Sequence, residues 1–245
     1  MSDLTVAVLA GGHSRRMGSP KPMLRLGSSS VVERVTAAAR PLGAPVVLIA
    51  APPTLLPEEP GAPHTPTTSD PESRGSPHPN DEPSLADFLA SLDLPVYCDL
   101  EPDRGPLGGL QAAFELTGSA EILLLACDLP FVTTAFLQFL LDRRPLTADA
   151  LVPRSESGPE PLCALYSISC RASLARALRG PNLSIRRFVD GLDADGLHQS
   201  EYKHLDPKSL LFTNLNTPED YQRARDLWSG PMAQITCRFK LSEVT

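Results

Sequence analysis

The sequence predicts a three-layer α/β protein with an open, mostly parallel, Rossmann-like sheet. Short apolar runs rich in Val, Ile and Leu alternate with segments whose apolar residues recur at helical spacing. Strands that alternate with helices in this way usually pair in parallel through right-handed crossovers. Polar and glycine-rich motifs follow several of the apolar runs. Because open α/β sheets bind ligands beyond the carboxyl ends of their strands, we expect a ligand site at that edge.

The first elements form a strand–helix–strand unit. Thr5–Ala10 is a short apolar run that ends at Gly11–Gly12, which predicts a buried strand followed by a tight turn. Ser30–Ala39 is predicted to be helical, with Ser30 as its cap and apolar residues at helical spacing. Pro45–Ala51 is a second apolar run and a second buried strand. This order predicts a parallel βαβ unit.

Residues 52–83 interrupt the alternation. They contain ten of the 26 prolines, with Ser, Thr, Asp and Glu between them. Such a segment cannot bury enough apolar surface to offset its chain entropy, so we expect a flexible or disordered insert. A short helix at 84–92 is expected to return the chain to the domain. The sequence therefore predicts one domain at residues 1–228 that carries this insert, followed by a C-terminal tail at 229–245.

The rest of the chain continues the alternation. The patterns predict strands at 95–98, 121–126, 150–153, 163–167 and 211–215 and helices at 110–116, 134–142, 174–178, 184–189 and 217–228. Glu121–Ala126 is the most apolar run of the chain and is expected to form the central strand. Asp99–Gly109 is rich in turn residues and is predicted to be a loop that ends where the helix at 110–116 begins.

The bulk properties exclude several classes of protein. A net charge of −7 gives no global attraction to nucleic acid or to anionic membranes. The sequence has no apolar run of about 18 residues, and the apolar run at its start lacks the basic flank of a signal peptide. The five cysteines are scattered without CxxC spacing, which is typical of reduced thiols rather than of structural zinc. We therefore expect a cytoplasmic protein whose partners are neither nucleic acids nor membranes.

The loop after the first strand has the composition of a polyphosphate site. Leu9–Lys21 reads LAGGHSRRMGSPK. Its glycines allow backbone amides to approach an anion closely, and Arg15, Arg16 and Lys21 add positive charge. The spacing matches neither GxGxxG nor GxxxxGK[ST], which disfavours a dinucleotide fold or a Walker-type NTPase. We expect this loop to bind a nucleoside triphosphate.

Several motifs, in the same order along the chain, resemble those of one family of small nucleotidyltransferases. They are Leu9–Lys21 (LAGGHSRRMGSPK), Glu101–Leu110 (EPDRGPLGGL), Ala126–Phe131 (ACDLPF) and Asn214–Asp220 (NLNTPED). Together they are similar to the motifs of molybdenum cofactor guanylyltransferases of the MobA type. The resemblance implies a sheet of the nucleotide-diphospho-sugar transferase type. It also implies transfer of GMP from GTP to the phosphate of molybdenum-molybdopterin, which forms the guanine dinucleotide cofactor and releases pyrophosphate.

The resemblance implies roles for individual residues. The family's nucleotide-binding residues match Leu9, Ala10, Gly11, Gly12, Lys21, Asp99 and Asp128. Its catalytic residues match Arg16, Lys21 and Asp128: Arg16 is expected to neutralise the leaving pyrophosphate, Lys21 to contact phosphates and Asp128 to bind Mg²⁺. One aspartate suits this metal, because Mg²⁺ often takes only one or two carboxylates together with substrate phosphates. Asn216 either supports the metal site or caps the last helix, and both roles are open.

Two departures from the family pattern bear on the choice of base. Pro20 stands where the family usually has aspartate, and the Ala-Ala-Pro segment at 50–52 lacks the asparagine that contacts the base. GTP and molybdopterin are the expected small-molecule partners, and molybdoenzymes or cofactor-delivery proteins are candidate protein partners. One alternative is transfer of CMP or another nucleotide to molybdopterin or to another small phosphorylated acceptor. The other is a non-catalytic module that binds nucleotide or cofactor.

Overall fold

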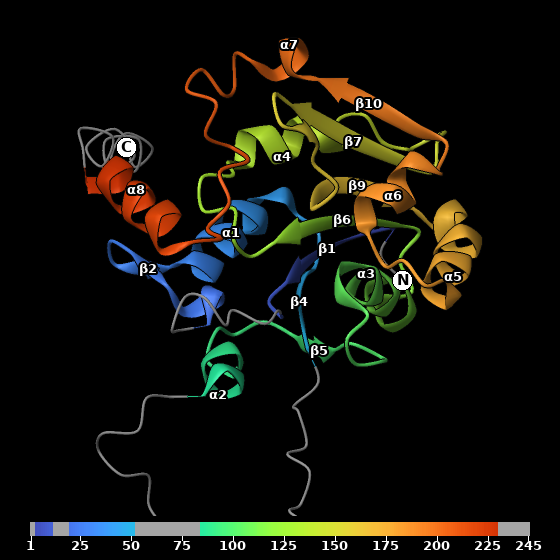
Figure 1. Cartoon of the computed structure of the whole chain (residues 1–245), viewed down its shortest axis with the longest axis horizontal. Helices are drawn as coiled ribbons and strands as arrows, with labels where there is room; N and C mark the ends of the chain where they lie inside the picture. Colours follow the sequence, from blue (N-terminus) through green and yellow to red (C-terminus); the bar gives the residue numbers. More distant parts are fainter. Residues whose placement is uncertain (1–2, 12–19, 52–83, 230–245) are drawn as a thin grey trace, which may run out of the picture.

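A computed structural model describes residues 3–11, 20–51 and 84–229, and its centre is an eight-stranded sheet (Figure 1). The strand order is β10-β7-β9-β6-β1-β4-β5, with β8 paired to β7. The strands of this sheet are β1 (Leu4–Leu9), β4 (Val46–Ala50), β5 (Val96–Cys98), β6 (Glu121–Ala126), β7 (Ala150–Ser155), β8 (Gly158–Pro159), β9 (Cys163–Ser167) and β10 (Ala194–His198). Along this order β9 runs antiparallel to both neighbours, and the other strands are parallel to one another. The predicted open, mostly parallel sheet is confirmed, with β6 in its middle.

Helices cover both faces of this sheet. They are α1 (Val31–Ala39), α2 (Leu85–Ala90), α3 (Gly105–Thr117), α4 (Thr134–Leu141), α5 (Arg171–Arg179), α6 (Ile185–Asp190), α7 (Gln199–Tyr202) and α8 (Pro218–Ser229), with 3-10 turns η1 (Lys21–Met23), η2 (Arg40–Leu42) and η3 (Ile168–Cys170). One apolar core joins the sheet to α1 and α4, and the other joins it to α3, α5 and α6. Alternate residues of β6 serve the two cores: Leu123 and Leu125 face the first, and Ile122 and Leu124 face the second. The predicted three layers are therefore confirmed.

A third, smaller core joins segments from opposite ends of the sequence. The hairpin of β2 (Arg25–Leu26) and β3 (Ser29–Ser30) packs through Leu26 against Leu215 and α8. Arg34 of α1 lies over the ring of Trp228 at 3.5 Å from its centroid. This packing holds the segment that follows η1 against the segment that leads into α8.

Most predicted elements form where the sequence places them, and α1 shows why. The Ser30 hydroxyl accepts a hydrogen bond from the Glu33 amide at 3.2 Å, and the Glu33 carboxylate accepts one from the Ser30 amide at 2.6 Å. This reciprocal pair is a capping box, which satisfies two amides that the start of a helix leaves without partners. The helix therefore begins directly after the predicted cap.

The strand predicted at 211–215 is wrong. Leu211 and Leu215 are buried, so the apolar pattern does reflect burial. Their amides, however, donate to the Asp206 carboxylate and to the Asp128 carbonyl oxygen, both at 3.3 Å, and not to a neighbouring strand. The segment is an irregular connection that buries two leucines.

The start of α3 also differs from the prediction, because the helix begins at Gly105 and not at Leu110. Pro106 lies in its first turn, and Gly109 is buried against β1, where an added Cβ would lie 2.5 Å from Leu9 Cδ2. Close packing on the strand overrides the low helix propensity of glycine. The predicted loop at 99–109 is correspondingly shorter.

The sequence does not predict β10, which forms one edge of the sheet. Its residues, ADGLH, bury Leu197 and leave Asp195, Gly196 and His198 exposed. Backbone pairing with β7 forms this strand, and a single buried side chain gives no periodic signal.

The division into one domain, an insert and a tail stays a prediction. The insert at 52–83 and residues 230–245 lie outside the described part of the chain, and α8 ends at Ser229. No helix within the described ranges has the length and apolar character needed to cross a bilayer.

Candidate functional site

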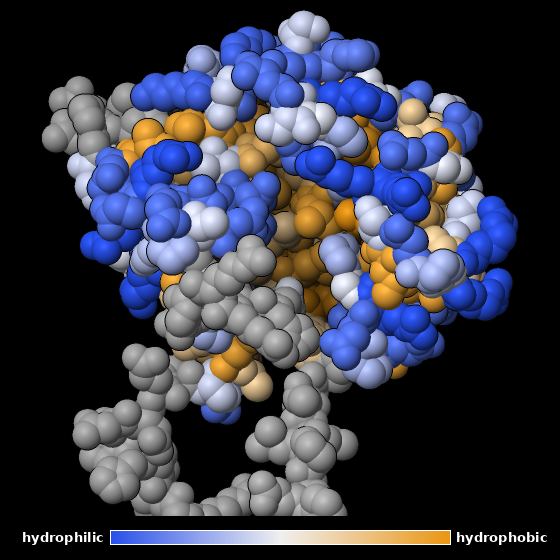
Figure 2. All heavy atoms as spheres, in the orientation of Figure 1, coloured by the Kyte–Doolittle hydropathy of each residue, from blue (hydrophilic) through white to orange (hydrophobic). Residues whose placement is uncertain are grey.

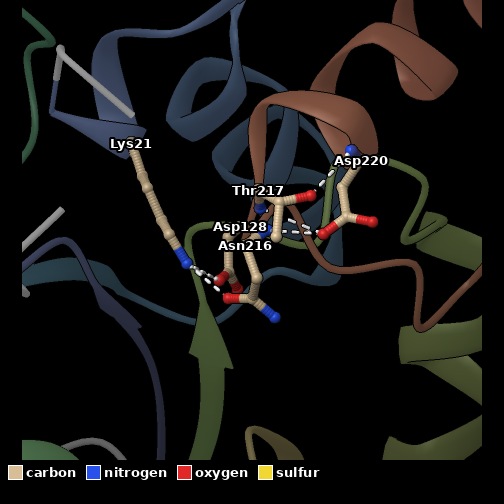
Figure 3. Close-up of polar contacts among 5 residues, drawn as sticks. All are labelled: Lys21, Asp128, Asn216, Thr217 and Asp220. Carbon is tan, nitrogen blue, oxygen red and sulfur yellow. Dashed lines mark hydrogen bonds and ion pairs between the residues drawn. The ribbon is translucent and has the colours of Figure 1, made fainter. Parts of the chain in front are cut away.

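Three polar side chains from distant parts of the sequence meet beyond the carboxyl end of β6 (Figure 3). The Lys21 Nζ atom lies 2.9 Å from Asp128 Oδ2 and 2.6 Å from Asn216 Oδ1. Lys21 opens η1, Asp128 follows β6 and Asn216 precedes α8. The side chains of Lys21 and Asp128 are 22% and 16% exposed, so a ligand from solvent can reach them. Two oxygens thus converge on one positive charge at an accessible point.

The first turn of α8 fixes the residue that carries one of these oxygens. The Asp220 carboxylate accepts hydrogen bonds from the amides of Asn216 and Thr217 at 3.2 and 3.0 Å, and Thr217 Oγ1 accepts one from the Asp220 amide at 3.1 Å (Figure 3). Thr217 and Asp220 therefore cap the helix, and the Asn216 side chain faces Lys21. Of the two roles left open for Asn216, its side-chain contacts favour the polar site.

Asp128 emerges beside the end of β1. The two strands pair in parallel with Leu9 opposite Ala126, and the Cys127 amide donates to the Leu9 carbonyl at 3.1 Å. Residues that follow paired parallel strands leave the sheet at the same edge. Gly11, after β1, and Asp128, after β6, therefore share this edge, as the sequence predicts.

Gly11 is required by the close approach of β1 and β4. A Cβ at this position would lie 2.5 Å from the Ala51 backbone nitrogen, which is closer than real Cβ atoms come to other heavy atoms. The obstacle is backbone, so it cannot rotate away as a side chain could. Any side chain at residue 11 would have to separate the ends of the two strands.

We therefore expect Gly11→Ala to destabilise the protein by about 1–3 kcal/mol, which is the usual cost of overpacking. Urea unfolding followed by circular dichroism measures the change. Gly191→Ala is the matched control, because a Cβ there would meet the Phe188 carbonyl oxygen at an ordinary 3.5 Å. Equal unfolding midpoints for the two variants would contradict this account of Gly11.

A pocket of about 350 Å³ opens at the same edge of the sheet. It is lined by Leu9, Gly11, Ile49, Ala51, Asp99, Asp103, Gly105, Pro106 and Gly109. These residues come from the ends of β1, β4 and β5, from the loop before α3 and from the first two turns of α3. Figure 2 shows that this face of the molecule also has an apolar hollow over β6 and β1, surrounded by hydrophilic residues. The pocket's volume and its mixture of apolar side chains with a few polar groups suit a small flat group such as a nucleobase.

Asp99 lines this pocket and carries a buried acceptor without a partner. Its backbone amide donates to the Ala50 carbonyl at 2.9 Å, which holds the residue at the end of β5. Its Oδ1 atom is buried and has no hydrogen-bond partner among the described residues. Burial raises the pKa of this carboxyl to about 6. A buried acceptor with no protein donor suits a ligand that brings its own N–H or O–H groups.

The structure divides the predicted site residues into groups. Leu9, Gly11 and Asp99 line the pocket, whereas Lys21 and Asp128 are in direct contact with each other. Gly12 and Arg16 lie outside the described residues, so their predicted roles stay predictions. Ala10 is fully buried, and its amide donates to the Ile49 carbonyl at 2.8 Å, so its side chain packs inside the fold.

Asp220 and Asp103 are site residues that the sequence reasoning missed. The T-x-x-D spacing from Thr217 to Asp220 was a readable signal, because it resembles a capping box. Asp103 lines the pocket with a backbone φ of +58°, which no sequence pattern indicates.

The cluster also fits a hard metal ion. Within the described ranges, no group of three or more His, Cys, Asp or Glu side chains could hold a metal. Asp128 and Asn216 nevertheless supply a carboxylate and an amide oxygen to one point, which the positively charged Lys21 ammonium contacts. This donor set suits Mg²⁺, which needs few protein oxygens when substrate phosphates and water complete its shell.

Several known proteins resemble this chain in both sequence and fold. A molybdenum cofactor guanylyltransferase from Desulfosudis oleivorans is 26% identical over 225 residues, with 91% of this chain and 95% of that protein covered. A protein of Opitutus terrae named as a probable molybdenum cofactor guanylyltransferase is 31% identical, with 91% and 96% covered. The crystal structure of molybdopterin-guanine dinucleotide biosynthesis protein A from Archaeoglobus fulgidus is 25% identical. It has a TM-score of 0.70 and covers 92% of this chain and 98% of that chain.

The family itself follows from a match over most of the chain. The MobA-like NTP transferase domain matches residues 6–196, which include most of β1, the pocket and Asp128. The motif that contains Asn216 lies beyond the matched range. The Asn216 side chain nevertheless contacts Lys21, and α8 packs on the β2–β3 hairpin. The chain belongs to the family of MobA-like NTP transferase domains.

Proposed function

We propose that this protein transfers GMP from GTP to the phosphate of molybdenum-molybdopterin, forming the guanine dinucleotide cofactor and pyrophosphate. The names of its relatives support this reaction. The observation that carries the proposal is the convergence of Lys21, Asp128 and Asn216 at the edge of the sheet where β1 and β6 end. Cytoplasmic location and protein partners such as molybdoenzymes stay predictions.

The proposed reaction needs no nucleophile from the protein. An oxygen of the acceptor phosphate attacks the α-phosphorus of GTP, and the bond from this phosphorus to the oxygen that bridges to the β-phosphate breaks. Pyrophosphate leaves with the electron pair of that bond. Negative charge grows on the leaving group, so the protein accelerates the step mainly by positioning the substrates and stabilising charge.

The residues of the cluster have complementary roles in this step. The Lys21 ammonium is placed to bind phosphate oxygens, and Arg16 and Gly12 are assigned to the same triphosphate by resemblance. Asp128 and Asn216 are the residues that would hold Mg²⁺, which when bound neutralises charge on the phosphates. Gly11 lines the pocket, so its backbone is placed to contact the nucleotide.

In this proposal, Asp99 contributes to the choice of base. Guanine presents two adjacent N–H donors on its Watson–Crick edge, and a carboxylate can accept both. Asp99 lines the pocket that fits a base, and its carboxylate keeps one buried oxygen, Oδ1, without a partner among the described residues. Asp99 therefore compensates for the asparagine that the segment at 50–52 lacks.

Asp99→Asn is expected to change stability and binding in opposite directions. Because the folded-state pKa is raised from 3.8 to about 6, ionisation destabilises the fold as pH rises through this interval, and the loss is complete above it. Asparagine removes this cost. The free energy of unfolding of the variant at pH 7.5 is therefore expected to exceed that of the wild type by on the order of 1 kcal/mol, which raises its unfolding temperature. The difference from the wild type should shrink at pH 5. GTP affinity at pH 7.5 should fall about tenfold, because a charged acceptor is lost.

Differential scanning fluorimetry at both pH values and titration calorimetry with GTP measure these effects. Asp93→Asn is the control, because Asp93 is exposed and asparagine tolerates its positive φ. A variant that is less stable at pH 7.5, or that binds GTP as the wild type does, would remove Asp99 from this role.

A turnover panel tests the proposed function itself. Pyrophosphate release is measured with GTP, CTP, ATP and UTP, each with Mg²⁺ and with or without molybdenum-molybdopterin, and products are identified by mass spectrometry. We expect release to require the acceptor and to be fastest with GTP. Faster release with CTP would support the cytidylyl alternative, and GTP binding without any release would support a non-catalytic module.

A further inference from the structure

The point at which Asp128 and Asn216 converge is already filled in the free protein. The Lys21 ammonium contacts Asp128 Oδ2 at 2.9 Å and Asn216 Oδ1 at 2.6 Å (Figure 3). Both are hydrogen bonds to a charged donor, the stronger class of such bonds. Only about a fifth of each side chain of the Lys21–Asp128 pair is exposed, so water screens it less than a surface ion pair.

The two oxygens are fixed, whereas the lysine can move. Asp128 lies two residues after the buried strand β6, and the backbone at Asn216 is held by Asp220 in the first turn of α8. Lys21 reaches the same point on a flexible four-carbon stem from the short turn η1. When another cation competes for this point, the lysine is the group that can leave.

From this arrangement we infer that Lys21 competes with free divalent ions, and that the site takes up the metal preferentially as a metal–triphosphate complex. An ammonium and a divalent ion repel each other and need the same Asp128 oxygen, so a free ion has to break the Lys21–Asp128 contact and brings no anionic group in exchange. A triphosphate that arrives with the metal offers Lys21 several anionic oxygens in exchange. The lysine then changes partner from carboxylate to phosphate, and no charge is left uncompensated.

This inference rests on the proposed function, since it assumes that Asp128 and Asn216 receive the metal. It predicts an effect that a lysine serving only to bind phosphate would not have. Removal of the lysine should strengthen the binding of a free divalent ion in the absence of nucleotide. Loss of a residue that merely supports the site should weaken that binding or leave it unchanged.

The test titrates the nucleotide-free, full-length protein with Mn²⁺, observed by electron paramagnetic resonance of the free ion. We expect Lys21→Met to bind Mn²⁺ about tenfold more tightly than the wild type, because the ammonium that competes for the Asp128 carboxylate is gone. Asp128→Asn combined with Lys21→Met should abolish the gain, because the carboxylate is the ligand. Equal or weaker binding by Lys21→Met would overturn the inference.

Two controls keep this result specific. Lys203→Met removes the same charge from an exposed lysine that donates to Ser209, so it corrects for the change in net charge and should leave Mn²⁺ affinity unchanged. If Lys21→Met fails to fold, as judged by circular dichroism, Lys21→Gln keeps a polar head without the charge and is expected to shift affinity in the same direction. The titration contains no nucleotide or acceptor, so GMP transfer with unchanged Mn²⁺ affinity would overturn this inference alone. Tighter Mn²⁺ binding without GMP transfer would overturn only the proposed function.

Discussion

Replacement of Asp128 by asparagine is expected to lower kcat/KM for pyrophosphate release from GTP by about 10²- to 10³-fold. Asparagine has nearly the same shape and can still accept a hydrogen bond from Lys21, so the local packing should survive. What disappears is the only carboxylate that contacts Lys21 at this point among the described residues. The metal would lose its charged protein ligand, and the charge that develops on the leaving pyrophosphate would be less well stabilised.

Initial rates of pyrophosphate release at several Mg²⁺ concentrations measure this effect. The loss should be partly recovered at high Mg²⁺, because weakened metal binding can be offset by mass action. Asp226→Asn is the matched control, since Asp226 lies on α8 and accepts a hydrogen bond from Gln222. Wild-type turnover in Asp128→Asn would show that this carboxylate has no part in the reaction.

Lys21→Ala is expected to reduce kcat by about 10²-fold or more while the fold stays intact. The lysine lies at the surface of the site and not in an apolar core, so its loss leaves no large cavity. Its charge is needed on the triphosphate, where stabilisation increases as pyrophosphate departs. We therefore expect kcat to fall more than KM rises.

Steady-state kinetics with GTP and the acceptor separate these two parameters. Lys203→Ala serves as the control for loss of a lysine, because its ammonium bonds to Ser209, outside the Lys21 cluster and the pocket. A rise in KM with unchanged kcat would mean that Lys21 binds the ground state and the transition state equally. Combined with the Mn²⁺ titration, the same position should show slower turnover and tighter binding of the free ion.

The sequence predicted the parts of this fold in which local pattern and tertiary environment agree. Central strands such as β1 and β6 are buried on both faces of the sheet. Nearly all their residues are therefore apolar, and a continuous apolar run in the sequence predicts them directly. The capping box at Ser30 fixed the start of α1. The strand expected at 211–215 failed because burial of leucine side chains does not determine where the backbone amides bond, and here the Asp206 carboxylate takes one of them.

The candidate site shows the same division. Motif order brought Lys21 and Asp128 into one hypothesis, and their 2.9 Å contact agrees with it. No pattern could show that Asp99 has a buried oxygen without a partner, because this depends on how the end of β5 packs against the first turn of α3. The sequence likewise did not predict that Lys21 contacts Asp128 and Asn216, since a lysine in a phosphate loop is expected to bind phosphate.

A crystal structure of the protein with Mg²⁺ and the α,β-methylene analogue of GTP tests the central claim most directly. The account predicts the base in the pocket beside Gly11 and Asp99, the metal on Asp128 and the Lys21 ammonium on phosphate oxygens. A nucleotide bound away from this edge of the sheet, or a metal held elsewhere while Lys21 still contacts Asp128, would contradict it.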